Sequence, residues 1–337
     1  MRIEVWFMLE HARRMLHRLC YSYQRLLADS ADTGHDVEMA DASKPHTKLS
    51  FHRKEWLTIA GSAVNDDGGG SAAQLAWLLD GATGLPQERL LPGDSDAQWL
   101  VSEACSFFER LTDCRPAAQH LSALSAFLSS RFEAARVRVP SPDKLEEIPS
   151  ASLAFALIEG QFLTIANIGD CRTLVRFPNG VIRQFGDSPV SALDAYVVGR
   201  LVELQRSNPD AGFGALKADL LPLIRRNRLL KNQPNGYWVL EPGGSWLPRV
   251  QYFAAGMAPG THVLMLSDGF YRLVDHYHLY SDESLLAAAL EDGLQVLARR
   301  LRQVEDEDPE CRAHPRLKAR DDASALLLAI EGAVDAR

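Results

Sequence analysis

The sequence has no excess of basic residues and no long hydrophobic run. Lysine and arginine number 36 against 44 aspartate and glutamate residues, which gives a formal net charge of −8. Binding to duplex nucleic acid needs a basic face that neutralises phosphates, so we expect no nucleic-acid partner. No apolar stretch approaches the ~18 residues that a membrane-spanning helix needs. We therefore expect a soluble protein without a transmembrane segment.

Cysteines are few, and their spacing forms no known pattern. There are five of them, scattered along the chain without a Cys-x-x-Cys pair: Cys20, Cys105, Cys114, Cys171 and Cys311. An odd, scattered set argues against a disulfide framework and against a structural zinc site. The first residues carry charges and are followed by no small-residue cleavage site, unlike a secretory signal. The cytoplasm is the expected compartment.

The N-terminal segment, residues 1–50, differs from the rest of the chain. Residues 3–27 predict one amphipathic helix, in which leucines recur at helical spacing with arginines between them. A basic amphipathic helix can pack on its own domain, dock on a partner or lie on an anionic membrane surface. Residues 28–50 are polar and aperiodic, which is typical of a linker.

From residue 51 onward, the sequence mixes strand and helix patterns. Apolar runs that suit buried strands occur at residues 56–60, 75–79, 153–158, 162–168, 173–177, 237–240, 262–266 and 325–330. Helical periodicity marks residues 97–112, 117–135, 192–206, 216–230 and 284–305. Asn179-Gly180 predicts a hairpin, and residues 66–71 predict a glycine-rich hairpin loop. Hairpins rather than β-α-β units favour antiparallel sheets with helices layered outside.

Acidic residues recur where the predicted strands end or begin. Five such sites occur: Asp66-Asp67, Asp80-Gly81, Asp170, Asp268-Gly269 and Asp321-Asp322. Each one alone is compatible with an ordinary turn. Together they can converge at one edge of a sandwich, and converging carboxylates raise each other's pKa unless a cation neutralises them. Oxygen ligands without histidine or cysteine select Mg²⁺ or Mn²⁺ over zinc.

Five sequence blocks resemble the metal-dependent protein phosphatases, the type 2C serine/threonine family, and especially its compact bacterial members. The blocks follow the family order and cover roughly residues 55–330. They are Asn65-Asp66-Asp67, Leu79-Asp80-Gly81-Ala82-Thr83-Gly84, Ala166-Asn167-Ile168-Gly169-Asp170-Cys171-Arg172, Leu266-Ser267-Asp268-Gly269 and Arg320-Asp321-Asp322-Ala323-Ser324.

The resemblance implies an α+β fold for residues 51–335, a four-layer α-β-β-α sandwich of two antiparallel sheets flanked by helices. It also implies a site for two Mn²⁺ or Mg²⁺ ions, with metal ligands from Asp66, Asp67, Asp80, Gly81, Asp268 and Asp321. Asp80 would bridge both ions, and Asp66 would ligate one or hold a metal-bound water, so these two are the expected catalytic residues. Asp170 and Arg172 would support the loops of the site.

The implied activity is hydrolysis of phosphoserine or phosphothreonine in a phosphorylated protein substrate, by direct attack of a metal-bridging water. Some positions depart from the family pattern. Ser62 stands where many members have an arginine that grips the substrate phosphate, and Arg53 or Lys54 could replace it. Ala82 stands where eukaryotic members have a histidine that acts as general acid. The missing arginine motivates an alternative function, a pseudophosphatase that keeps the fold and acts as a binding or regulatory module.

A helical insertion is expected at about residues 188–232, near the point where the family has a mobile flap. It could act as a lid or docking surface, or it could be a surface elaboration without a role in the reaction.

Overall fold

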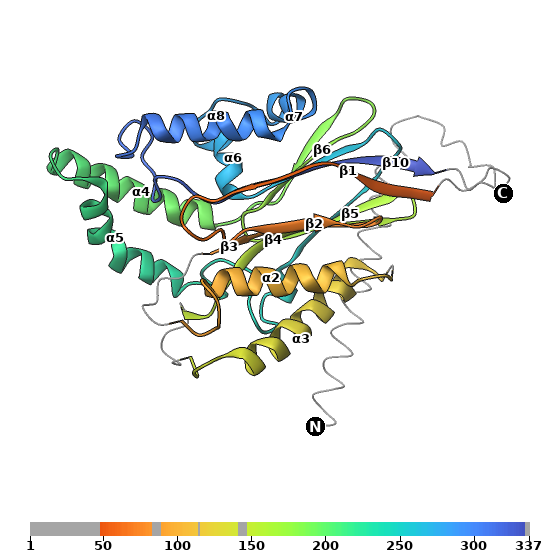
Figure 1. The fold of residues 1–337 in the computed structure, drawn as a ribbon, viewed down its shortest axis with the longest axis horizontal. Coiled ribbons are helices and arrows are strands. Elements are labelled where there is room, and N and C mark those ends of the chain that lie inside the picture. The colour runs from red at the N-terminus through yellow and green to blue at the C-terminus, as the bar shows by residue number, and fades with distance from the viewer. Residues whose placement is uncertain (1–47, 83–88, 114, 141–146, 334–337) are drawn as a thin grey trace. The chain divides into compact units, whose positions relative to one another are not determined.

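Two five-stranded antiparallel sheets form the centre of the molecule (Figure 1). The first sheet has the order β1-β10-β9-β6-β7, with bounds Lys48–Ile59, Ala323–Ala333, His262–Leu266, Arg172–Arg176 and Ile182–Phe185. The second has the order β2-β3-β4-β5-β8, with bounds Gly68–Ser71, Leu75–Gly81, Ala151–Glu159, Phe162–Ile168 and Gln251–Gly256.

This computed structural model describes residues 48–82, 89–113, 115–140 and 147–333. The predicted N-terminal helix at residues 3–27 lies outside the described residues, and so does the predicted linker except for residues 48–50, which begin β1. Among the residues described, no helix is both long and apolar enough to cross a membrane.

Helices cover the outer face of each sheet (Figure 1). The first sheet is covered by α6 (Asp268–Asp275), α7 (Asp282–Glu291) and α8 (Leu294–Glu307), and the second by α2 (Asp96–Glu109) and α3 (Ala117–Ala135). The predicted four-layer α-β-β-α sandwich is therefore confirmed.

Alternation of side chains along β3 shows how the layers are held together. Leu75, Trp77 and Leu79 face α2 and α3, whereas Ala76 and Leu78 face the other sheet. Successive side chains of a strand point to opposite faces, so a strand between two apolar layers is apolar throughout. This explains why the central strands appear in the sequence as continuous apolar runs.

Phe108 of α2 fills the layer between helix and sheet, and its truncation gives a first prediction. Its ring is fully buried, with centroids 5.2 Å from Phe155 and 5.4 Å from Trp77. We expect Phe108→Ala to lower the free energy of unfolding by about 3–5 kcal/mol, because neighbouring rings cannot collapse into the cavity. Denaturant titration measures this. Phe162→Ala, at an aromatic residue 44% exposed, is the control and should cost far less.

Some predicted elements differ from the structure. Residues 237–240 are not a strand; they form isolated bridges, and β8 supplies the edge strand instead. The predicted helix 284–305 is two helices, because Gly293, with φ 84°, adopts a left-handed conformation that ends one before the next begins. Residues 68–71 are strand β2 rather than a loop, since Trp56 and Trp77 pack over their glycines.

Two antiparallel helices, α4 (Val190–Ser207) and α5 (Phe213–Arg228), lie at one end of the sandwich (Figure 1). They occupy the segment for which an insertion is predicted. Their shared core is small and consists of Val197, Leu201, Leu216 and Leu220. This helix pair closes the far wall of the pocket described next.

Candidate active site

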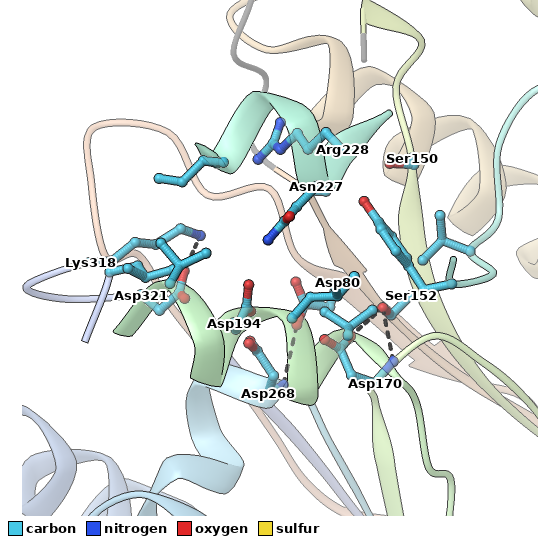
Figure 2. A pocket seen from close by; sticks show the side chains of 18 of the residues that line it. Asp80, Ser150, Ser152, Asp170, Asp194, Asn227, Arg228, Asp268, Lys318 and Asp321 are labelled. Carbon is cyan, nitrogen blue, oxygen red and sulfur yellow. Dashed lines mark hydrogen bonds and ion pairs between the residues drawn. The ribbon is translucent and has the colours of Figure 1, made fainter. Parts of the chain in front are cut away.

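A cavity of about 380 Å³ lies between the edge of the sandwich and helices α4 and α5. Figure 2 shows carboxylates on its floor and the last turn of α5 across from them. Its acidic lining residues are Asp80, Asp170, Asp194, Asp268 and Asp321. The predicted convergence of strand-end acids therefore occurs here for Asp80, Asp170, Asp268 and Asp321, and the Gly81 backbone joins them.

The strand registers explain this convergence. Asp80 pairs with Ser152 across β3 and β4, near the end of both strands that faces the cavity. Asp170 follows β5 and accepts a hydrogen bond from the Ser152 hydroxyl. Asp268 begins α6 directly after β9, and its backbone N–H donates to the Asp80 carboxylate at 3.2 Å. Antiparallel pairing brings the ends of neighbouring strands to one edge, so residues far apart in sequence meet.

Asp80 is half-buried and lies among other negative charges. Burial, followed by the charges of Asp268, Asp67 and Asp170, holds the pKa of Asp80 well above its ordinary value. Burial and repulsion from Asp268 likewise raise the pKa of Asp170 to about 6. Such shifts mean that the site disfavours the ionised form of these two carboxyl groups, first through desolvation and then through like charges.

Asp321 is in a different environment. Its carboxylate forms ion pairs with Arg272 of α6, at 2.6 Å, and with Lys318. Burial opposes ionisation, but the cations of Lys318 and Arg272 outweigh it, and the pKa of Asp321 is lowered. The chain itself thus neutralises one predicted metal ligand.

Asp66 and Asp67 do not line the pocket. The loop that carries them is held by Asp322, whose carboxylate accepts hydrogen bonds from the backbone N–H groups of Gly61 at 2.7 Å and Asp66 at 2.8 Å. Neither carboxylate oxygen of Asp67 accepts a hydrogen bond from the described residues. Burial, then repulsion from Asp322 and other acids, raises the pKa of Asp67 to about 8.

Gly81 allows this loop to lie against β3. A Cβ atom at position 81 would stand 2.3 Å from the carbonyl oxygen of Asp66. We expect Gly81→Ala to displace the Asp66-Asp67 loop and to lower the free energy of unfolding by about 1–3 kcal/mol, the usual cost of overpacking. Gly256→Ala, where an added Cβ meets nothing within 4 Å, is the control. Equal melting temperatures for the two variants would contradict the prediction.

No protein-family model and no curated protein matches the chain. Solved structures do. The chain is similar to type 2C-like serine/threonine phosphatases. The catalytic domain of the phosphatase PstP, in complex with two manganese ions, aligns at 16% identity and a TM-score of 0.48, over 84% of this chain and all of that one. The phosphatase Stp1 from Staphylococcus aureus aligns at 17% identity and a TM-score of 0.45, over 87% of this chain and 100% of that one. The S. agalactiae serine/threonine phosphatase aligns at 14% identity and a TM-score of 0.48, over 83% of this chain and 99% of that one.

At such identities the likeness concerns the fold alone, and the site must be judged from this chain's own residues. In the described ranges, 48–333 with their gaps, no group of three or more histidine, cysteine, aspartate and glutamate side chains is arranged to hold a metal ion. The carboxylates are neighbours, but they do not form a coordination shell.

The supporting residue Arg172 and the positions considered for phosphate binding, Ser62, Arg53 and Lys54, all lie outside the pocket lining. Arg172 does not line the pocket; its guanidinium donates to the Gly186 carbonyl at 2.8 Å and lies 5.7 Å from the ring of Tyr271. Ser62 is exposed, and its hydroxyl donates to the Val64 carbonyl at 3.0 Å. Neither Arg53 nor Lys54 lines the pocket, and the Lys54 ammonium is 3.7 Å from Glu331.

Several pocket residues have no counterpart in the sequence motifs. Asp194 projects from α4, and burial followed by repulsion from Asp170 and Asp268 raises its pKa to about 7. Asn227 and Arg228 project from the end of α5, and Lys318 from the loop before β10. No local pattern marks these residues, because their position follows from how α4 and α5 pack at the sandwich edge.

Proposed function

We propose that this chain is a metal-dependent phosphatase that hydrolyses phosphoserine or phosphothreonine in proteins, acting in the cytoplasm. The observation that supports it is the pocket in which Asp80, Asp170, Asp194 and Asp268 gather, with the pKa values of the first three raised. Carboxyl groups with raised pKa values destabilise the fold unless cations balance them, so such a cluster indicates a function.

The donor atoms suit hard divalent cations by their chemistry, although among the described residues their side chains are not arranged as a coordination shell. Asp80, Asp268 and the Gly81 backbone face the pocket, and the buried oxygens of Asp67 lack hydrogen-bond donors among the described residues. Carboxylate and carbonyl oxygens favour Mg²⁺ or Mn²⁺. When bound, two such ions would balance these charges and activate water toward phosphorus. Asp321 suits this role less well, since Lys318 and Arg272 already occupy its oxygens.

The chain's own groups orient the acids. The backbone N–H of Asp268 fixes the Asp80 carboxylate, and the Ser152 hydroxyl fixes that of Asp170. Arg272 connects α6 to Asp321. Helices α4 and α5 contribute part of the pocket lining.

The test is hydrolysis of an aryl phosphate and a phosphothreonine peptide with Mn²⁺, Mg²⁺ or a chelator. We expect turnover with either metal and none with chelator. A protein that is folded and binds metal by calorimetry, yet turns over neither substrate, would instead support the pseudophosphatase. The pairing of Asp321 with Lys318 and Arg272 is the observation that favours this second function.

A further inference from the structure

The pocket has an acid-rich wall and a wall formed by α5. Acids from the strand ends form one wall, and α5 contributes Asn227 and Arg228 to the other (Figure 2). Arg225 and Arg226 belong to the same last turn of α5, but their side chains are exposed and line no part of this pocket. Only Arg228 of these three arginines reaches the cavity.

Asn227 and Arg228 present hydrogen-bond donors that have no acceptor among the described residues. The side-chain nitrogen of Asn227 is buried and has no hydrogen-bond partner among the described residues. The Arg228 guanidinium likewise forms no hydrogen bond and no ion pair with the described residues. Burial lowers the pKa of Arg228, and the partial compensation comes from Tyr237 and Asp194.

The favourable interaction of a cation with a helix C-terminus does not explain why the Arg228 side chain lies in the pocket. Cations near a helix C-terminus contribute only about 0.3–1 kcal/mol, and the exposed Arg225 and Arg226 already provide that contribution. Arg228 is half-buried, and removing part of a guanidinium and a buried amide N–H from water without acceptors is costly. A ligand that supplies several acceptor oxygens and negative charge would remove that cost.

We propose that Arg228 and Asn227 bind the phosphoryl group of the substrate, a phosphate monoester dianion. The proposal rests on the proposed function. The planar guanidinium fork can donate to two phosphoryl oxygens at once, and the Asn227 amide can donate to a third. The wall of α5 thereby supplies the phosphate contact that Ser62 does not provide.

The experiment compares Arg228→Gln with Arg226→Gln in the full chain with Mg²⁺. Calorimetric titration with inorganic phosphate gives the dissociation constant, and kinetics on a phosphothreonine peptide gives KM and kcat separately. We expect Arg228→Gln to raise the dissociation constant and KM about 10- to 100-fold, the effect of losing charge-assisted hydrogen bonds, with Arg226→Gln close to the wild type. Arg228→Lys should recover only part of the affinity, because lysine lacks the fork.

The outcomes separate this inference from the proposed function. Wild-type turnover with unchanged phosphate affinity in folded Arg228→Gln would overturn the inference and leave the function standing. Phosphate binding that depends on Arg228, without turnover, would support the inference and reject the function. If Arg228→Gln fails to fold, Asn227→Ala decides, and unchanged phosphate affinity in that variant overturns the inference. A wild-type chain that does not bind phosphate also overturns it.

Discussion

Asp80→Asn should abolish most metal-dependent hydrolysis and, at the same time, make the metal-free protein more stable. Asp80 lies in the pocket within reach of the Asp268 backbone and carboxylate, so its charge is central to any cation bound there. Loss of one group that stabilises the reacting charge typically costs about 100- to 1,000-fold in kcat, and we expect a loss in that range.

The stability gain has the same physical origin. The amide is nearly the same size as the carboxylate but carries no charge, so burial and repulsion from Asp268, Asp67 and Asp170 no longer oppose folding. Each pKa unit corresponds to about 1.4 kcal/mol, and about 1 kcal/mol shifts the melting temperature of a domain of this size by roughly 2–4 °C. Thermal unfolding with chelator should show Asp80→Asn above the wild type.

The control is Asp292→Asn, which removes an exposed carboxylate that does not line the pocket. It should change neither turnover nor melting temperature. Undiminished metal-dependent turnover in Asp80→Asn would show that the proposed cation site is wrong, whatever its effect on stability.

Metal-free protein should become more stable as the pH falls from 8 to 6.5. The pKa of Asp67 is raised to about 8 and that of Asp194 to about 7, mainly by burial, whereas both groups ionise near 3.8 in an unfolded chain. Within this window the folded state binds more protons than the unfolded state, so stability decreases as the pH rises. The stability contributed by the neutral acids is present at the lower pH and lost as the pH passes their folded pKa values.

His276 limits the window at its acidic end. Burial, aided by the charge of Arg272, lowers the pKa of His276 to about 4. Below pH 6.5 this histidine takes up a proton in the unfolded chain but not in the folded one, which favours unfolding. This effect opposes the increase in stability that the acids provide at low pH. Melting curves with chelator at pH 8.0 and pH 6.5 test the prediction without this contribution.

Divalent metal should reverse the trend. At pH 8.0, Mn²⁺ or Mg²⁺ at about 100 times its dissociation constant would add about 2.7 kcal/mol, because it binds the folded carboxylates and not the unfolded chain. Asp67→Asn should flatten the pH dependence in chelator. A melting temperature that rises with pH in the metal-free wild type would contradict the charge cluster as described.

Much of the fold could be predicted from local sequence because its signals are local. The apolar runs of β3, β4 and β9 are continuous, since both faces of these strands are covered. Helices α2 and α3 follow their apolar periodicity. Edge strands are more difficult to predict. β8 has mostly exposed residues and no continuous apolar run, so the sequence does not predict it.

The same distinction holds for the site. The sequence by itself determined that acids stand at strand ends, because an aspartate after an apolar run is a local pattern, and Asp80, Asp170, Asp268 and Asp321 do line one pocket. Only the tertiary structure decided what surrounds them. The pairing of Asp321 with Arg272 joins residues 49 positions apart in sequence.

The helices beside the sandwich show the physical reason most clearly. Arg225, Arg226 and Arg228 are consecutive or nearly consecutive arginines of one helical turn, and nothing in their order distinguishes them. Which one reaches the pocket depends on the face that α5 turns toward the carboxylates. That face is set by packing against α4 through Leu216 and Leu220, and packing between distant segments leaves no local pattern in a single sequence.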